Sequence, residues 1–431
     1  MKRILSILCI LSLLFGCFSV AFGEDEKITL RMAWWGGDSR HEATLKAIAA
    51  YQELHPNVTI EPEYVGNTTS YLSKLNNELG AKTAPDILQI DYKWLKDFTD
   101  QKQNFVNLYD YVDKLPMDQL AESIVNTYCV RDGFFLGVPI GLNALCINTN
   151  IPALTEFGIE FPENPSWEDI IEMGKKVQEK DSSKYLLWIQ TGHYYQLFRS
   201  MMFQRLGKNP FNEETYQPNF TVDDVVAYFT WLKEAVDTKT IPPLEETEIY
   251  GKVFANEIPG WLEGRYLCAT SGASTMATVI NASGFDVGVA TWPMMADAKA
   301  YGTMTSVLSM MFGVAANSEH PDVAVDFISW YSNDETAIEI MKDARGIPIN
   351  QKALGILIDK NMVMPQVKKA IDLATMDGAM SENALDLNTS LTATFDYYYQ
   401  AVGLNQMSPE EAAAAYMDEL ARALEDLKAA E

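Results

Sequence analysis

Short apolar runs alternate with longer amphipathic stretches along the first hundred residues of the chain. Residues 28–34 form an apolar run suited to a buried strand, and a second strand around 58–60 and a third at 87–90 follow. Between them, residues 40–54 and 72–79 carry apolar side chains at helical spacing. Strand, helix, strand, helix and strand in this order predict an α/β fold with a mostly parallel, doubly wound sheet.

Parallel sheets of this kind bind ligands beyond the carboxyl ends of their strands. In this sequence those ends are residues 34–40, 64–68 and 91–94. We therefore expect the functional side chains of the first part of the chain to come from these three loops.

The later sequence is richer in helix signals. A hairpin is predicted over 128–138, around Arg131-Asp132-Gly133, and a strand over 145–148. Ser166 begins a helix with Glu168 and Asp169 in its first turn, and Ser408-Pro409-Glu410-Glu411 reads as a capping box that starts another. We find no internal repeat and no low-complexity linker, so composition does not mark a domain boundary.

Residues 1–23 read as an export signal. Lys2 and Arg3 precede about a dozen largely apolar residues, a stretch shorter than a membrane-spanning helix needs. Cleavage after Gly23 is one reading, and a lipoprotein signal that would place a lipid on Cys17 is the other. Either way we expect the protein outside the cytoplasmic membrane, in the periplasm or anchored by lipid at the outer face of the membrane.

Charge and composition narrow the classes of partner. The chain has 431 residues, and 33 Lys and Arg against 59 Asp and Glu give a net charge of −26. Such a surface repels phosphate backbones and anionic lipids, so we expect no nucleic-acid partner. Nine Trp, 20 Tyr and 19 Phe exceed what a core alone requires and favour a binding cleft lined in part by rings.

Catalytic and metal-binding signatures are missing from the sequence. It contains no G-x-G-x-x-G, P-loop, G-x-S-x-G or C-x-x-C motif. The four histidines share no metal-ligand spacing, so we expect neither a metal nor a cofactor. Beyond the leader only Cys129, Cys146 and Cys268 remain, which favours buried free thiols over a disulfide scaffold.

Several phrases, in order along nearly the whole chain, resemble the extracellular solute-binding proteins of ABC importers, in particular the sugar-binding family that includes the maltose-binding proteins. They are LRMAWWGGDSRHEATLKAIAAYQELHPNVTIEPEYV, SYLSKLNNELGAKTAPDILQID, GVPIGLNALCINTNI, NPSWEDIIEMGKKV, WLEGRYLCATSGASTM, FDVGVATWPM, SVLSMMFGVAANSEHPDVAVDFISWYSNDE and ARGIPINQKA. One departure is GASTM, which stands where many members carry Gly-x-Trp and removes an expected stacking ring.

The resemblance implies two α/β lobes, each a mostly parallel sheet flanked by helices, with hinge strands between them. It assigns 24–138 and 287–344 to the first lobe, and 139–286 and 345–431 to the second. It also implies a monomeric receptor, not an enzyme, that closes over a sugar or oligosaccharide and delivers it to the membrane-spanning subunits of a permease. An extracellular enzyme acting on saccharides, or a receptor for another ligand such as a polyamine, remains the alternative.

Site residues follow from the strand ends together with the resemblance. In the first loop, Asp38 and Arg40 can grip sugar hydroxyls, while Asp38 as a helix cap and Arg40 in an ion pair are the structural alternatives. Asp91 has a similar alternative as a cap. The full set of expected ligand residues is Trp35, Gly36, Asp38, Arg40, Asp91, Tyr92, Trp94, Asn143, His193, Tyr194, Trp261, Gly272, Ser274, Trp292, Arg345, Phe395 and Tyr398.

Overall fold

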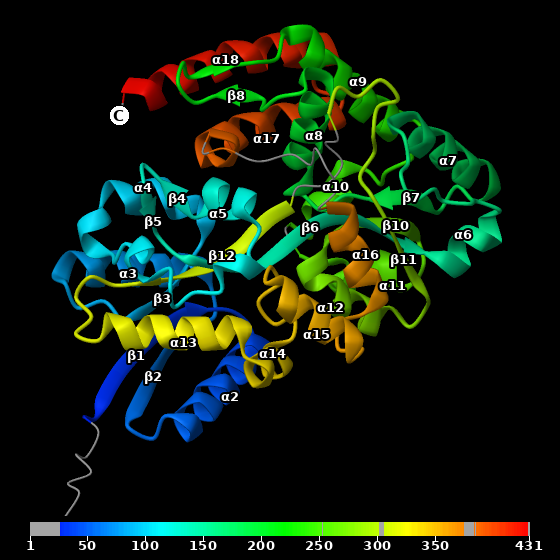
Figure 1. Ribbon diagram of the computed structural model, residues 1–431. Helices are drawn as coiled ribbons and strands as arrows, with labels where there is room; N and C mark the ends of the chain where they lie inside the picture. The colour runs from blue at the N-terminus through cyan, green and yellow to red at the C-terminus, as the bar shows by residue number, and fades with distance from the viewer. Residues whose placement is uncertain (1–25, 252, 301–305, 375–382, 384, 430–431) are drawn as a thin grey trace, which may run out of the picture.

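A long strand, β6 (Val138–Asn150), runs through the middle of the sheet in the computed structural model of the protein (Figure 1). The structure describes residues 26–251, 253–300, 306–374, 383 and 385–429. Within these residues the strand order is β2 (Val58–Val65), β1 (Ile28–Trp35), β3 (Ile87–Ile90), β12 (Ser306–Val314), β6, β10 (Tyr266–Gly272) and β7 (Tyr185–Trp188). Two further strands, β11 (Val287–Ala290) and β13 (Ile347–Pro348), also pair with β6.

The two halves of β6 pair with different partners. Its first half runs antiparallel to β12, where Ala144 lies opposite Ser306. Its second half runs antiparallel to β10, where Leu145 lies opposite Gly272. The strand therefore passes at residues 144–145 from a first group of strands to a second. The first group is β1, β2, β3 and β12, and the second is β7, β10 and β11.

Carboxyl ends from both groups of strands point toward this section of β6. Strands β1 and β3 are parallel, and β12 is antiparallel to β3, with Met311 opposite Ile90. Since β12 begins at Ser306, opposite Ala144, the carboxyl end of β3 is directed toward the middle of β6. Strand β10 ends at Gly272, opposite Leu145, and so approaches the same section from the other side.

The two groups of strands pack against separate hydrophobic cores. The first core joins β1, β2 and β3 to later elements as far along the chain as Leu373. The second spans residues from Leu145 to Leu424, and a smaller third core surrounds Trp261 and Trp188. Each core therefore collects side chains from distant parts of the sequence.

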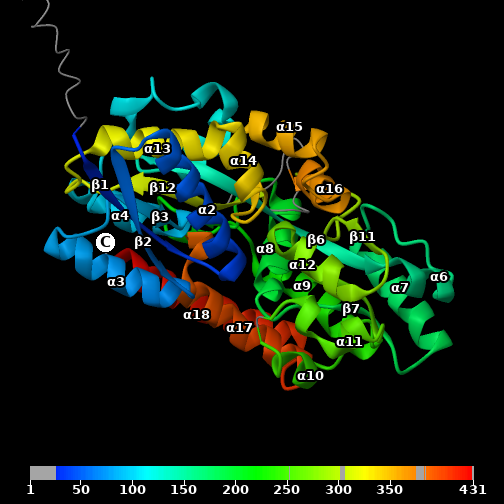
Figure 2. The same ribbon diagram turned by 90° about the horizontal axis from the view of Figure 1, so that it is seen from below.

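Helices cover both groups of strands (Figures 1 and 2). Around the first core lie α2 (Asp38–Leu54), α3 (Thr68–Ala81), α4 (Leu95–Asp100), α5 (Glu122–Tyr128), α13 (Pro321–Asn333), α14 (Glu335–Met341), α15 (Gln351–Asp359) and α16 (Pro365–Ala374). The others are α6 (Ile151–Phe157), α7 (Trp167–Lys180), α8 (His193–Leu206), α9 (Val222–Asp237), α10 (Leu244–Glu248), α11 (Pro259–Leu262), α12 (Ala273–Ser283), α17 (Thr389–Gly403) and α18 (Pro409–Ala429).

Helices α15 and α16 fall in the segment 345–431, which the resemblance assigns to the second lobe. Their side chains Leu357 and Val367 nevertheless belong to the first core. Helix α16 also contacts β6, β11 and α12. It therefore lies where the two groups of strands meet.

The predicted α/β alternation of the first hundred residues is confirmed. Ser166 and Asp169 form a reciprocal capping box at the start of α7, with hydrogen bonds of 2.9 and 2.8 Å. Ser408 and Glu411 do the same before α18. The predicted strand 145–148 is only part of β6, which extends well to either side of it.

The three cysteines that the structure describes, Cys129, Cys146 and Cys268, are buried free thiols, as the sequence predicts. Burial raises the pKa of each thiol. None of the helices in the described ranges combines the length and the apolarity that a membrane crossing requires. Residues 1–23, with Cys17 and both cleavage readings, lie outside the described residues.

Candidate functional site

An aromatic cluster stands at the carboxyl edge of the first group of strands. The ring of Trp35, the last residue of β1, lies 5.0 Å from the ring of Tyr71 and 5.3 Å from that of Trp94, measured between centroids. Trp35 and Trp94 each keep 8% of their surface exposed. We call Trp35, Tyr71 and Trp94 the edge cluster; it presents ring surface where the sheet predicts a ligand.

Asp91 follows β3 and begins the short 3-10 turn η1 (Tyr92–Trp94). Its carboxylate accepts a hydrogen bond of 3.1 Å from the backbone N–H of Lys93, so the capping alternative is correct. Asp91 is half-buried. Tyr92 packs edge-on against Tyr128 at 5.4 Å, which fixes its ring beside the edge.

The first loop is held by Arg40 and requires glycine at position 36. A Cβ on Gly36 would lie 2.5 Å from Cδ of Arg40, so only glycine lets that side chain pass. Arg40 donates hydrogen bonds to the carbonyls of Trp35 (3.1 Å) and Ala344 (3.0 Å). These bonds fix the loop, and they replace the ion pair that was the structural alternative for Arg40. Asp38 is exposed in the first turn of α2, whose N-cap is Gly37.

Arg345, which the sequence predicts among the ligand residues, is buried and bonded to side chains of the first core. It is 2% exposed and donates hydrogen bonds to the Tyr331 hydroxyl (2.6 Å), the Thr44 hydroxyl (2.8 Å) and Oε1 of Gln89. Gln89 in turn donates to the carbonyl of Trp35 at 3.2 Å. Arg345 therefore supports the edge cluster from within the core.

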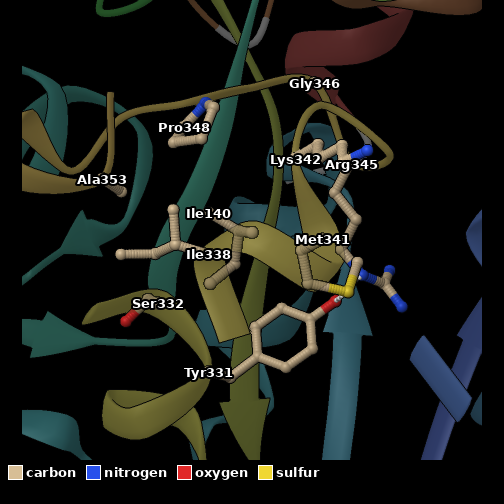
Figure 3. A pocket seen from close by; sticks show the side chains of 10 residues that line it. All are labelled: Ile140, Tyr331, Ser332, Ile338, Met341, Lys342, Arg345, Gly346, Pro348 and Ala353. Atoms are coloured by element: carbon tan, nitrogen blue, oxygen red, sulfur yellow. Dashed lines mark hydrogen bonds between the residues drawn. The ribbon is translucent and has the colours of Figure 1, made fainter. Parts of the chain in front are cut away.

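The cavity beside Arg345 is too small for a sugar. It has a volume of about 30 Å³ and lies among Tyr331, Met341 and Ile140 (Figure 3). A space of this size holds at most a water or two. It is a packing defect next to β13 and not a ligand site.

The opposite edge is formed by the middle of β6 and the end of β10. Asn143 is half-buried on β6, and a Cβ on Gly272 would lie 3.0 Å from its Oδ1. His193 begins α8, and its Nδ1 lies 2.8 Å from the Thr270 hydroxyl. Burial lowers the pKa of His193 to about 3, so the ring is neutral at physiological pH. Trp292 lies 5.6 Å from that ring and donates to the carbonyl of Cys146.

Three helices that start at these edges have glycine as N-cap and no side-chain capping bond. They are α2 after Gly37, α8 after Gly192 and α12 after Gly272. Other helices also start without a side-chain capping bond, among them α5, α10, α11 and α13, whereas α3 after Asn67 and α9 after Thr221 are capped by side chains. An uncapped start leaves backbone N–H donors for a ligand's oxygen atoms.

Four expected ligand residues are buried among other side chains of the cores. Trp261 is fully buried in the third core and donates to the Ser283 hydroxyl at 2.9 Å. Tyr194 stacks on Tyr399 at 4.5 Å, and Phe395 packs among the rings of the second core. Tyr398 is 7% exposed and donates to Glu419 at 2.7 Å. These side chains are core residues because their helices turn them inward; Ser274 belongs to α12, but its side chain lies outside the described part.

Two polar or aromatic residues at the first edge escaped the sequence reasoning. Tyr71 lies within the amphipathic pattern of α3 and was indistinguishable from core. Gln89 did carry a signal, because it is the one polar residue within the apolar strand β3. Within the described ranges no group of three or more His, Cys, Asp or Glu side chains is placed to hold a metal ion.

Comparisons with known proteins bear on the family and the fold of the chain. The family model for bacterial extracellular solute-binding proteins matches residues 46–375. An arabinooligosaccharide-binding protein of Halalkalibacterium halodurans is 25% identical over 263 residues; the match spans 57% of this chain and 57% of that relative's length.

Solved structures extend the likeness across the chain. A periplasmic solute-binding protein of Pectobacterium atrosepticum matches with a TM-score of 0.83 and 24% identity, covering 93% of this chain and 99% of the other. An oligogalacturonide-binding protein of Yersinia enterocolitica, solved with saturated digalacturonic acid, matches with a TM-score of 0.80 and 23% identity over the same shares. The two-lobed solute-binding fold expected from the sequence is thereby confirmed. The chain belongs to the family of bacterial extracellular solute-binding proteins.

Proposed function

We propose that the protein is the saccharide-binding receptor of an ABC importer and holds its ligand between the two strand edges. The observation that carries this proposal is the convergence of the carboxyl ends of β3 and β10 on residues 144–145 of β6. The rings of the first edge and the polar groups of both edges suit a sugar, which offers an apolar C–H face and many hydroxyls. The names of the arabinooligosaccharide-binding and oligogalacturonide-binding relatives support this ligand class.

The residues that we propose for the ligand are those at the two edges. On the first edge they are Trp35, Gly36, Asp38, Asp91, Tyr92 and Trp94. On the second edge they are Asn143, His193 and Gly272, with Trp292, which is 1% exposed, packed behind His193. We retain Arg40 as a residue that holds the first loop, and its second guanidinium nitrogen remains a candidate contact.

Closure follows from the proposed lobes. With 24–138 and 287–344 in one lobe and 139–286 and 345–431 in the other, the chain passes between them at the start of β6, at the start of β11 and just before β13. A ligand that contacts both edges favours the closed form over the open form. Several kcal/mol of differential binding are needed to shift such an equilibrium fully. The closed receptor would then dock on the permease outside the cytoplasmic membrane, without chemical change to the sugar.

A panel of mono- and oligosaccharides, with spermidine as a cationic probe, tests this function. We expect thermal stabilisation by at least one saccharide and no products after incubation, because a ligand that binds only the folded state raises Tm. Products formed in proportion to protein would favour the enzyme alternative. Stabilisation by spermidine alone would favour the polyamine alternative.

A matched pair of variants then tests the first edge. Asp91→Asn keeps a capping side chain but removes the carboxylate, so we expect affinity to fall about tenfold with little change in Tm. Asp334→Asn is the control, since Asp334 caps α14 through Thr336 at 2.9 Å and lies away from both edges. Equal affinities for Asp91→Asn and the wild type would remove Asp91 from the site.

A further inference from the structure

The hydroxyl of Thr270 lies between two groups at the second edge. Thr270 is on β10, two residues before Gly272, and is 2% exposed. The backbone N–H of Gln190, which follows β7, donates to this hydroxyl at 3.0 Å. Nδ1 of His193, at the start of α8, lies 2.8 Å from the same oxygen. Positions 270 and 272 face the same side of β10, where Gly272 lies against the amide of Asn143.

The arrangement of donors decides which ring nitrogen of His193 carries the proton. A threonine hydroxyl has one proton to donate and two lone pairs to accept. The oxygen of Thr270 already accepts the N–H of Gln190, and among the described residues only Nδ1 of His193 is placed to accept the hydroxyl proton. The reverse direction would leave that buried proton without an acceptor, which costs free energy.

The hydroxyl therefore donates to Nδ1 of His193. Burial keeps the ring neutral, with a pKa of about 3, so the single ring proton is on Nε2. The second ring nitrogen is thus a hydrogen-bond donor, and its direction is set by the contact that the first one makes.

Nε2 of His193 is open to a ligand. It makes no hydrogen bond within the described part of the chain, and it is not among the fully buried polar atoms there that lack a partner. It therefore keeps contact with solvent, although only 8% of the residue is exposed. The ring of Trp292, 5.6 Å away, and the Thr270 hydroxyl hold the imidazole in place. A ligand oxygen that approaches Nε2 meets a fixed N–H donor.

We propose that Thr270 is a positioning residue that fixes His193 as an Nε2–H donor, so that this point of the site takes an oxygen atom of the ligand. The inference rests on the proposed saccharide function and adds the direction of one hydrogen bond. Hydroxyl, ring and carboxylate oxygens of a saccharide can accept from Nε2–H, whereas the ammonium groups of a polyamine only donate. The same geometry therefore selects against the cationic alternative.

Nitrogen NMR of protein labelled with nitrogen-15 histidine measures the tautomer without a ligand. The chain has four histidines, and the signal of His193 is the one that His193→Gln removes. At pH 7.5 we expect a pyridine-type shift for Nδ1 and a pyrrole-type shift for Nε2. In Thr270→Val the two shifts should move toward each other, because the hydroxyl that favours one tautomer is gone. Thr270→Ser keeps a hydroxyl and should restore the wild-type shifts.

Calorimetry tests the consequence for binding, with arabinotriose and digalacturonic acid as probes. We expect Thr270→Val to weaken binding about tenfold and Thr270→Ser to bind within about twofold of the wild type. The matched control is Thr149→Val, which removes the hydroxyl of another buried threonine, on β6 opposite Cys268. It should keep the wild-type affinity and the wild-type shifts of His193.

Three results would overturn the positioning role and leave the receptor function standing. They are a proton on Nδ1 in the wild type, shifts and affinity in Thr270→Val that equal those of the wild type, and equal losses of affinity in Thr270→Val and Thr149→Val. If no saccharide binds, the proposed function fails and the ligand contact of His193 fails with it, whereas the shifts still show whether Thr270 fixes the tautomer.

Discussion

Arg40 donates a hydrogen bond of 3.0 Å from Nε to the carbonyl of Ala344, which lies 304 residues further along the chain. The same guanidinium holds the carbonyl of Trp35. Burial, reinforced by the nearby charge of Arg345, lowers the pKa of Arg40 to about 10, so the group stays charged at neutral pH. The loop after β1 is thus fastened to the segment that leads into β13, and β13 pairs with the middle of β6.

Replacing Arg345 should destabilise the protein. Arg345→Met removes the donors to Gln89, Thr44 and Tyr331, and we expect the free energy of unfolding to fall by about 2–4 kcal/mol in urea titrations. Arg422→Met is the control, because Arg422 is exposed on α18 and donates only to a carbonyl of its own helix. Equal losses in both variants would contradict the supporting role of Arg345.

A variant of Trp261 tests whether this side chain belongs to the core or to the ligand site. Trp261→Ala opens a space in the third core and breaks the bond to Ser283, so we expect a loss of about 3–5 kcal/mol in stability. Saccharide affinity, measured by calorimetry well below Tm, should match that of the wild type. A large loss of affinity in protein that remains folded would return Trp261 to the ligand site.

His193 makes stability depend on pH. Its folded-state pKa of about 3 lies below the ordinary value of 6.5, so the unfolded chain takes up a proton that the folded protein refuses. The contribution of neutral His193 to the free energy of unfolding is therefore complete above pH 6.5. It is lost as the pH falls toward 3, by about 1 kcal/mol for each pH unit.

Urea titrations at pH 8, 6 and 5 measure this loss with few carboxylates titrating. The variant His193→Gln should lose less stability than the wild type between pH 6 and pH 5, and the difference at pH 8 corrects for lost packing. If the free energy of unfolding changed with pH by the same amount in both proteins, His193 would have the same protonation state in the folded and the unfolded chain.

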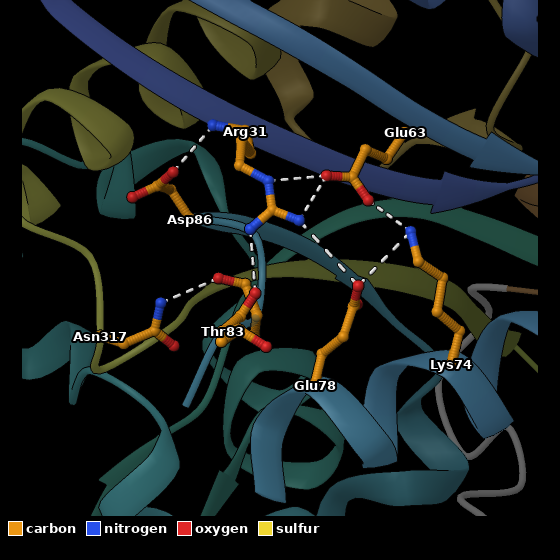
Figure 4. A network of polar contacts seen from close by, with 8 residues as sticks. Arg31, Glu63, Lys74, Glu78, Thr83, Asp86 and Asn317 are labelled. Atoms are coloured by element: carbon orange, nitrogen blue, oxygen red, sulfur yellow. Dashed lines mark hydrogen bonds and ion pairs between the residues drawn. The ribbon is translucent and has the colours of Figure 1, made fainter. Parts of the chain in front are cut away.

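Asp86, directly before the first residue of β3, is a carboxylate with a structural role. It accepts hydrogen bonds from the backbone N–H of Arg31 (2.7 Å) and from the Ser318 hydroxyl (2.5 Å), within a network that includes Glu63 and Lys74 (Figure 4). We expect Asp86→Ala to cost about 1–3 kcal/mol of stability without changing saccharide affinity. Ser318→Ala should cost less, since it removes one of the two bonds; a loss of affinity in Asp86→Ala would contradict this assignment.

Local patterns predicted the first three strands and their helices, because each element there is short and its period is clear. They did not predict the length of β6. Pro139, Gly141 and Asn143 interrupt its apolar run, and the pairing with β12 joins residues far apart in sequence. The strand propensities of single residues cannot predict a pairing register that is set by tertiary contacts.

The candidate site was predictable at strand ends and not on helices. Trp35 and Asp91 follow strands, and the topology alone places them at one edge. Family likeness identified the segments around Trp261, Tyr194 and Phe395 but not the direction of each side chain. Successive residues of a helix point in directions that differ by about 100°. A shift of one position along the helix therefore separates a ligand contact from a core residue.

The extent of the first core has a consequence for how the protein matures. Leu30 and Leu373 contribute to the same core, so β1 cannot reach its final surroundings until most of the chain has been made. Pairings over such long sequence separations form slowly. The local pairs of β1 with β2 and β3 can form early, but the core that covers them is completed only when the segment around Leu373 has been made.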